Sequence, residues 1–257
     1  MLKSLYTTAT GMKAQQTMVD MIANNIANVN TSGFKKSQAS FEDLFYVTLQ
    51  SPGLARGAGD AAVPIGTQIG SGTRLNGTTK VFTTGTLEIT ERSLDVAIDG
   101  DGFFSVILPD GQIAYTRDGS FHLNADGKLV TGAGNIVTPE ITVPADTLEI
   151  SVDPEGRVSG RTAGAPDTNT QFGQLQIHRF VNPSGMFAVG DNVMRWTDAS
   201  GRPFTGTPAS QGLGTLKQGF REGSNVNMAK ELVDLQLLMK QQEMLTKVLA
   251  HFGMIVP

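Results

Sequence analysis

The chain has 257 residues and a formal net charge of −4, enough length for one large domain or two smaller ones. It contains no cysteine, which excludes disulfides, thiolate metal sites and a cysteine nucleophile. The segment between the two ends is acidic, which argues against nucleic acid as a partner. No apolar run approaches the ~18 residues of a membrane span, and no apolar signal region opens the chain, so we expect no cleavable secretory signal.

The first predicted element is a helix over residues 2–29. Apolar side chains recur there at spacings of three and four, the pattern that pairs helices in coiled coils. Gly33 suits the left-handed position after the helix end. Asn24 and Asn28 lie one turn apart near that end. They are either part of a polar, fraying helix end or a pair that hydrogen-bonds across a helix interface and fixes its register.

Residues 34–50 follow, with aromatic anchors at Phe34, Phe41, Phe45 and Tyr46. The segment that comes next is rich in Gly, Ala and Pro, so it can form neither a regular helix nor a long strand. We expect an extended connector with little apolar bulk to hold it against its own domain. Segments of this kind often order against a neighbouring molecule.

From about residue 74 to residue 196 the period of the pattern changes to two, and the segments are rich in β-branched and aromatic residues. Turn signals such as residues 109–111 and 154–156 separate them. Short strands at this spacing predict a sandwich or barrel rather than a βαβ sheet. Residues 197–221 are again rich in Gly and Pro, and residues 224–227 form a plausible cap for the last helix.

The last predicted element is a helix that begins near Met228 and carries a second stripe at spacings of three and four. Gly253 and Pro257 are expected to terminate it. Both terminal helices also carry apolar residues off the stripe, and such a helix is usually buried on several sides. Packing among many copies of the chain fits this pattern, whereas an ordinary buried face within a monomer is the alternative.

No catalytic or metal-binding pattern stands out. The Gly-rich segments match neither dinucleotide nor P-loop motifs, and no nucleophile elbow occurs. A calcium loop starting at Asp99 would place Phe104 and Asp110 where a Gly and a Glu are required, so Asp-Gly turns explain Asp95, Asp99 and Asp101. The three histidines, expected at the surface or in packing roles, are His122, His178 and His251. We therefore expect no enzyme, no cofactor and no metal.

Three segments resemble bacterial flagellar rod and hook proteins. They are the run ANNIANVNTSGFK at residues 23–35, the segment GDGFFSVILPDGQIAYTRDGSFHLNADGKLVT at residues 100–131, and EGSNVNMAKELVDL at residues 222–235. Residues 41–74 are similar to the connector of the distal-rod branch of this family, which hook proteins lack. After Leu235 the chain departs from the usual run of the family.

The resemblance implies that both termini lie in an inner helical tube with the β-rich middle outside. The expected fold class is mainly β with α, in which the terminal helices pair as a coiled-coil-like domain. Residues 1–33 and 224–257 would form the helical polymerisation domain. Residues 34–73 and 197–223 would form the connector, and residues 74–196 the β-rich outer domain.

The resemblance also implies a structural role in the rod of the flagellar basal body. Copies would polymerise into a rigid hollow shaft that transmits motor torque and allows export through its channel, and each copy would leave the cell unfolded by the type III route. The implied partners are further copies, the proximal rod, the hook or hook-junction proteins, the surrounding ring proteins and the export apparatus. The alternatives are a proximal rod or hook-type paralogue and, from a different class, a periplasmic β-rich binding protein.

Two sets of residues carry the predicted contacts. The subunit interface is expected at Leu5, Met12, Val19, Ile22, Ile26, Asn24, Asn28, Leu232, Leu235, Met239, Leu245 and Leu249. The connector that gives rigidity is expected at Tyr46, Leu49, Pro52, Leu54, Pro64 and Ile69.

Overall fold

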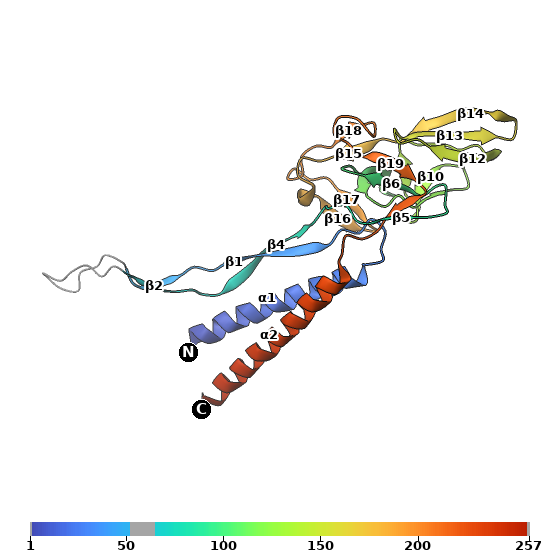
Figure 1. Cartoon of the computed structure of the whole chain (residues 1–257). Helices are drawn as coiled ribbons and strands as arrows, with labels where there is room; N and C mark the ends of the chain where they lie inside the picture. The colour runs from blue at the N-terminus through green and yellow to red at the C-terminus, as the bar shows by residue number, and fades with distance from the viewer. Residues whose placement is uncertain (1, 52–64, 256–257) are drawn as a thin grey trace. The chain divides into compact units, whose positions relative to one another are not determined.

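The computed structural model describes residues 2–51 and 65–255, apart from the side chains of residues 2, 165–167, 249 and 251–255. The fold is mainly β, with one long helix at each end of the chain (Figure 1).

The chain divides into two compact units. The first, here the helical unit, comprises residues 1–26, 37–79 and 228–257. The second, here the β unit, comprises residues 27–36 and 80–227. The chain therefore crosses between the two units four times, and each unit is built from segments far apart in the sequence.

The terminal helices are α1 (Leu2–Ala27) and α2 (Met228–Ile255). Helix α1 begins where the sequence predicts and ends two residues earlier, and Gly33 adopts the expected left-handed conformation with a φ of +68°. The prediction that Gly253 terminates α2 is wrong, since the helix continues to Ile255. A single glycine costs only about 1 kcal/mol inside a helix, so it need not end one.

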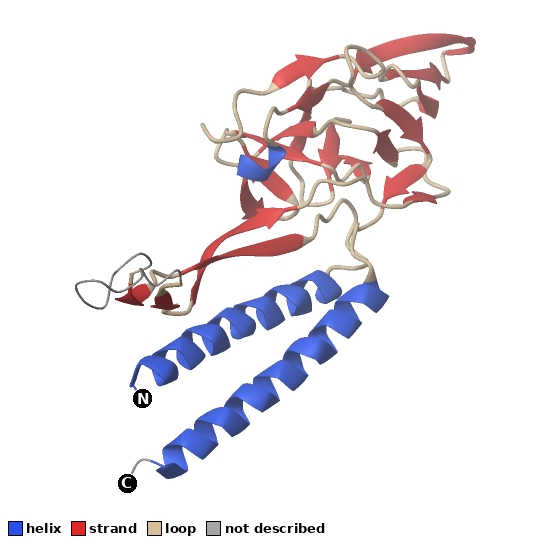
Figure 2. Cartoon of the chain, turned by 60° about the vertical axis from the view of Figure 1, so that its left-hand side comes forward, coloured by secondary structure: helices blue, strands red, loops and turns tan. Residues whose placement is uncertain are grey.

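A two-stranded ribbon completes the helical unit (Figure 2). Strand β1 (Ser37–Asp43) pairs with β4 (Thr73–Lys80), and β2 (Val47–Gln50) pairs antiparallel with β3 (Thr67–Ile69). The sequence predicts an extended connector here, and the described parts of it are paired strands.

The main sheet of the β unit has seven strands in the order β16-β17-β8-β7-β11-β10-β9, and all neighbours run antiparallel. The turn signal at residues 109–111 joins β7 to β8 as a hairpin, as predicted. The seven strands are β7 (Phe104–Ile107), β8 (Ile113–Thr116), β9 (Phe121–Leu123), β10 (Leu129–Thr131), β11 (Ile136–Thr138), β16 (Phe187–Gly190) and β17 (Val193–Arg195).

Smaller sheets complete the β unit: β6-β19, β5-β20, β12-β13-β14 and β15-β18. Strands β18, β19 and β20 lie in a segment in which the sequence indicates only a Gly- and Pro-rich connector. Their bounds and those of the short 3-10 helix η1 are β5 (Leu87–Ile89), β6 (Val96–Asp99), β12 (Thr147–Val152), β13 (Arg157–Thr162), β14 (Ala165–Gln174), β15 (Ile177–Arg179), η1 (Pro183–Gly185), β18 (Phe204–Gly206), β19 (Thr215–Gln218) and β20 (Phe220–Glu222).

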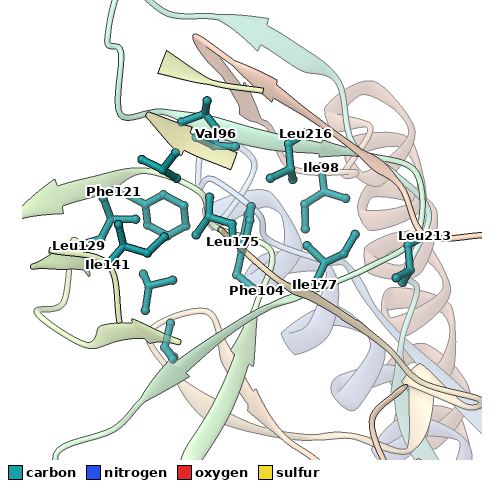
Figure 3. Close-up of a cluster of buried hydrophobic side chains, with 14 of the residues drawn as sticks. Val96, Ile98, Phe104, Phe121, Leu129, Ile141, Leu175, Ile177, Leu213 and Leu216 are labelled. Atoms are coloured by element: carbon teal, nitrogen blue, oxygen red, sulfur yellow. The ribbon is translucent and has the colours of Figure 1, made fainter. Parts of the chain in front are cut away.

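The β unit has a continuous apolar core (Figure 3). Phe104 and Phe121 meet edge to face, with ring centroids 5.0 Å apart, and both are fully buried. Ile98, Leu175 and Ile177 extend this core with exposed fractions of 1% or less. Burying one such side chain stabilises a fold by about 1.5–3 kcal/mol. This core can therefore stabilise the β unit without contacts from another copy.

Candidate assembly surfaces

The two terminal helices contact each other in the antiparallel sense. The amide of Gln15 lies 3.5 Å from that of Gln241, and the amide of Asn25 lies 3.3 Å from the carboxylate of Glu231. Higher residue numbers in α1 therefore lie beside lower residue numbers in α2, as expected for antiparallel helices. Both of these contacts are polar, and the coiled-coil-like apolar pairing of the two helices stays a prediction.

On α1 the predicted interface residues are mostly half-buried. Ile22 is buried, and the other apolar members, Leu5, Met12, Val19 and Ile26, are half-buried.

The two predicted asparagines differ in their surroundings. Asn24 is exposed, whereas Asn28 is half-buried and accepts a hydrogen bond from the Thr31 hydroxyl at 3.1 Å.

On α2 the predicted residues are more exposed. Leu232 and Met239 are exposed at 40% and 60%, whereas Leu235 and Leu245 are half-buried. The side chain of Leu249 lies outside the described residues. Among the side chains of α2 that the structure describes, the buried apolar one is Leu238, with 6% exposed, and it lies off the predicted stripe.

The exposed apolar residues of α2 form two stripes when the helix is viewed along its axis at 100° per residue. The first, here stripe one, consists of Val233, Leu237, Met244 and Val248. The second, here stripe two, consists of Met228, Leu232 and Met239. They flank the face that carries Leu238, and a polar strip of Gln236, Lys240, Glu243 and Lys247 lies opposite that face. A helix with apolar side chains on three sides is one that further helices can bury.

The tip of the ribbon carries a second exposed apolar cluster. Among the predicted connector residues, Tyr46, Leu49 and Ile69 are exposed at 55%, 65% and 45%, and Phe45 beside them is exposed at 93%. Pro52, Leu54 and Pro64 lie outside the described residues.

The ribbon lies directly against α1. Gly72 has a φ of +110°, and a Cβ atom added to it would lie 2.2 Å from the Oγ1 of Thr10, so only glycine fits this contact. The Lys3 amine donates to the carbonyl of Ile69 at 3.4 Å. Two grooves of about 450 and 490 Å³ lie beside this contact, lined in part by Tyr6, Leu44 and Leu75 and by Met18, Phe41 and Leu238 respectively.

A buried ion network holds the β unit together where its first segment meets β20. The carboxylate of Glu222 lies 2.6 Å from the Lys35 amine and 3.4 Å from the Arg117 guanidinium, and all three side chains are at most 2% exposed. The backbone N–H of Gly85 also donates to this carboxylate at 2.9 Å. Burial lowers the pKa of Lys35; the charge of Glu222 opposes this shift and that of Arg117 adds to it.

Asp99 and His178, which the sequence analysis considered for ion binding or catalysis, make ordinary contacts within the fold. Asp99 pairs with Lys217 at 2.7 Å. His178 is buried between the hydroxyls of Ser105 and Thr205, each 2.9 Å away, and burial lowers its pKa to about 4. His178 thus has the packing role that the sequence predicts.

Within the described residues, no group of three or more His, Cys, Asp or Glu side chains could hold a metal ion. The described helices do not include one that could cross a membrane.

Two buried polar residues, Asn25 and Glu222, escape sequence reasoning. Asn25 is 2% exposed and contacts Glu231, whereas the sequence analysis singles out Asn24 and Asn28 instead. Rotation by one residue turns a side chain 100° around a helix, so choosing among adjacent asparagines requires knowing what packs against each face. Glu222 lies 187 residues from Lys35, beyond the reach of any local pattern.

Comparison with known proteins gives consistent matches along the chain. Residues 5–35 match the family described as flagella basal body rod protein, and residues 97–160 match the flagellar hook protein FlgE/F/G D1 domain. The chain is 46% identical over 235 residues to the flagellar basal-body rod protein FlgG of Buchnera aphidicola, covering 91% of this chain and 90% of that protein. It is 43% identical over 251 residues to FlgG of Borreliella burgdorferi, covering 96% and 93%.

A hook protein matches over a shorter stretch. The flagellar hook protein FlgE of Helicobacter mustelae is 46% identical over 144 residues, which covers 53% of this chain and 30% of the hook protein. The nearly full-length similarity is therefore to rod proteins, and these are structural proteins rather than enzymes.

Proposed function

This chain belongs to the FlgG family of flagellar basal-body rod proteins and is a structural subunit of the flagellar rod, and we propose that its copies polymerise through their terminal helices into a rigid hollow shaft. The shaft would transmit motor torque to the hook and conduct later-exported subunits. Its further partners would be the proximal rod, the hook or hook-junction proteins, the surrounding rings and the export apparatus. Membership of the family supports the role in the rod, and the exposed apolar residues of the helical unit support the contacts between copies.

The observation that carries this proposal is the exposed apolar surface of α2. Val233, Leu237 and Met244 are each more than half exposed on one stripe, although side chains of this kind are normally buried. Because each is already partly buried, covering the rest of one contributes about 1–2 kcal/mol, and each 1.4 kcal/mol changes an association constant about tenfold. Contacts from other copies along two stripes would therefore be strong enough to hold a polymer.

The test replaces stripe one in the full-length chain. A variant with Val233, Leu237, Met244 and Val248 changed to Ser should form no filaments at concentrations at which the native chain does, as seen by electron microscopy. A control variant changes the polar strip, Gln236, Lys240, Glu243 and Lys247, to Ala and should still polymerise. Filaments from both variants would show that stripe one is not needed for polymerisation.

The ribbon is our proposed source of stiffness. Its exposed residues Tyr46, Leu49 and Ile69, together with Phe45, would pack against neighbouring copies and stop them sliding past one another. A shaft whose subunits cannot slide resists bending. Deleting residues 46–72 should then give a filament that bends visibly in electron micrographs, and straight, rigid filaments from the deleted protein would contradict this assignment.

The two alternatives make different predictions. If this chain were a hook-type paralogue, its filament would bend even though the chain carries the connector that hook proteins lack. A periplasmic β-rich binding protein would stay monomeric at full length and would bind a ligand saturably. Straight filaments from the native chain separate the rod subunit from both.

A further inference from the structure

The side chain of Asn25 joins three elements of the helical unit. It lies in the last turn of α1, with 2% of its surface exposed. Its Oδ1 accepts the backbone N–H of Ser37 at 2.9 Å, and its Nδ2 donates to the carbonyl of Ser37 at 3.0 Å and to Glu231 Oε2 at 3.3 Å. Ser37 begins β1 and Glu231 lies in the first turn of α2. One amide therefore holds α1, the ribbon and α2 together.

From this geometry we infer that Asn25 is the positioning residue that sets the angle between the two terminal helices. The inference rests on the proposed function, in which those helices form the wall of the polymer, and it names the side chain that presents them in the required geometry. Asn24, which precedes Asn25 directly, is exposed and therefore lies on another side of α1 from Asn25.

Two further hydrogen bonds between the helices are longer than the one that Asn25 makes. The two glutamine pairs, Gln15 with Gln241 and Gln16 with Gln242, have N···O distances of 3.5 Å between neutral amides, against 3.3 Å from Asn25 to the charged, buried carboxylate of Glu231. Both views show α1 and α2 close together where α1 ends and α2 begins, and further apart at their other ends (Figures 1 and 2). The helices thus lie closest together at the end of α1 that carries Asn25.

A long lever makes this position sensitive. Asn25 lies near one end of a helix, and at 1.5 Å per residue the other end is about 35 Å away. A change of about 10° at Asn25 would move that end by about 6 Å, more than the half-spacing of packed helices. Stripe residues displaced that far would no longer meet the same partners on a neighbouring copy.

The chemistry of the site selects an amide. Asparagine offers one acceptor and two N–H donors, and this site uses all three. Aspartate would keep the acceptor but would face the carboxylate of Glu231, 6% exposed, and the carbonyl of Ser37 with negative charge and no donor. Alanine would leave a buried N–H and a buried carboxylate without this partner.

Spin labels measure the angle directly, and the absence of native cysteines makes them specific. Cysteines replace Ala9 and Lys247, which are exposed at matching heights on the antiparallel helices, in the full-length chain. Double electron–electron resonance gives the distance distribution in the soluble chain and in filaments diluted with unlabelled native protein. Fluorescence of Trp196, the single tryptophan, reports whether the β unit is folded.

The expected result is one narrow distribution for the native chain and for the matched control Asn24→Asp, in at least one of the two states. Asn25→Asp should at least double the width or shift the mean by about 6 Å or more, while Trp196 fluorescence stays unchanged. Adding Glu231→Gln to Asn25→Asp should restore part of the narrowing, because the glutamine amide can donate to the aspartate.

Two results would overturn the role of Asn25: an unchanged distribution in Asn25→Asp, or a native distribution that is broad in both states. These results are distinct from a failure of the proposed function. A native chain that forms no filaments would contradict polymerisation, and the distribution in the soluble chain would still decide the role of Asn25.

Discussion

The β unit and the helical unit bury their apolar residues to very different degrees. Phe104, Ile98 and Ile177 in the β unit are fully buried, whereas Phe45 in the ribbon and Leu237 in α2 are 93% and 55% exposed. One copy of the chain therefore gives the β unit a buried core, although Ile89 and Val181 of that unit are 80% and 93% exposed, and it leaves most of the large apolar side chains described on α2 open. The β unit derives its stability from its own core, and the helical unit is suited to derive it from other copies.

The largest effect on the β unit is expected from Phe104→Ala. This side chain is fully buried and packs edge to face on Phe121, so its removal leaves a cavity that the sheet cannot easily fill. Such a change costs about 3–5 kcal/mol. Urea unfolding, monitored by Trp196 fluorescence, would measure the loss. A loss below about 1 kcal/mol would show that Phe104 is not packed in the core as described.

Glu222→Gln should cost nearly as much, about 3 kcal/mol, because it leaves Lys35 buried without the carboxylate it pairs with and Arg117 with only the charge of Asp101 nearby. The matched control is Glu88→Gln, which removes an exposed carboxylate 2.9 Å from Arg221. Exposed pairs contribute about 0–1 kcal/mol, so this control should change stability little. Equal losses in the two variants would mean that burial of the network has no energetic role.

Protonation of His178 at low pH should lower the free energy of unfolding by a smaller amount. Its folded-state pKa of about 4 lies below the ordinary value of 6.5, so the unfolded chain binds the proton more tightly than the folded chain. Stability from this group is therefore complete well above pH 6.5 and falls as the pH drops towards 4. Between pH 7 and pH 5 the loss should be about 2 kcal/mol.

Unfolding of the β unit in urea at several pH values would measure this slope. His178→Gln should flatten the curve in this window. His122→Gln, at an exposed position, serves as the control and should leave the curve unchanged. If the unfolding free energy of His178→Gln depended on pH as that of the native chain does, other groups would cause the acid sensitivity.

The sequence predicts well what depends on local pattern. Spacings of three and four locate both terminal helices, alternation locates the β-rich middle, and the turn signals at residues 109–111 and 154–156 join neighbouring strands as hairpins. Each of these features rests on residues within one or two turns of chain. Strands β19 and β20 were missed because they pair with β6 and β5, more than a hundred residues earlier.

What the sequence could not predict is which polar residues are buried. Lys35 and Glu222, or Asn25 and Glu231, look like ordinary surface residues until distant segments pack on them. The same limit applies to α2, where the stripe does not reveal that Leu238 faces inward and Met239 outward. Subunit contacts at the predicted interface residues stay a prediction for the same reason, because a second copy decides them.

The smallest effect on folding is expected from Phe45→Ala, which deletes the same kind of side chain as Phe104→Ala but in the other region. Because Phe45 is 93% exposed in one copy, its loss should change the unfolding free energy of the β unit by less than about 0.5 kcal/mol.

Its effect should appear only in the polymer. If the ribbon packs between copies, each subunit loses a buried aromatic contact of about 1.5–3 kcal/mol, and filaments should form at a higher critical concentration or bend more. Sedimentation of filaments and their curvature in electron micrographs measure both, with Thr48→Ala on the adjacent exposed strand β2 as the control. A Phe45→Ala variant that weakens the isolated β unit, yet polymerises like the native chain, would reverse the contrast between the two regions.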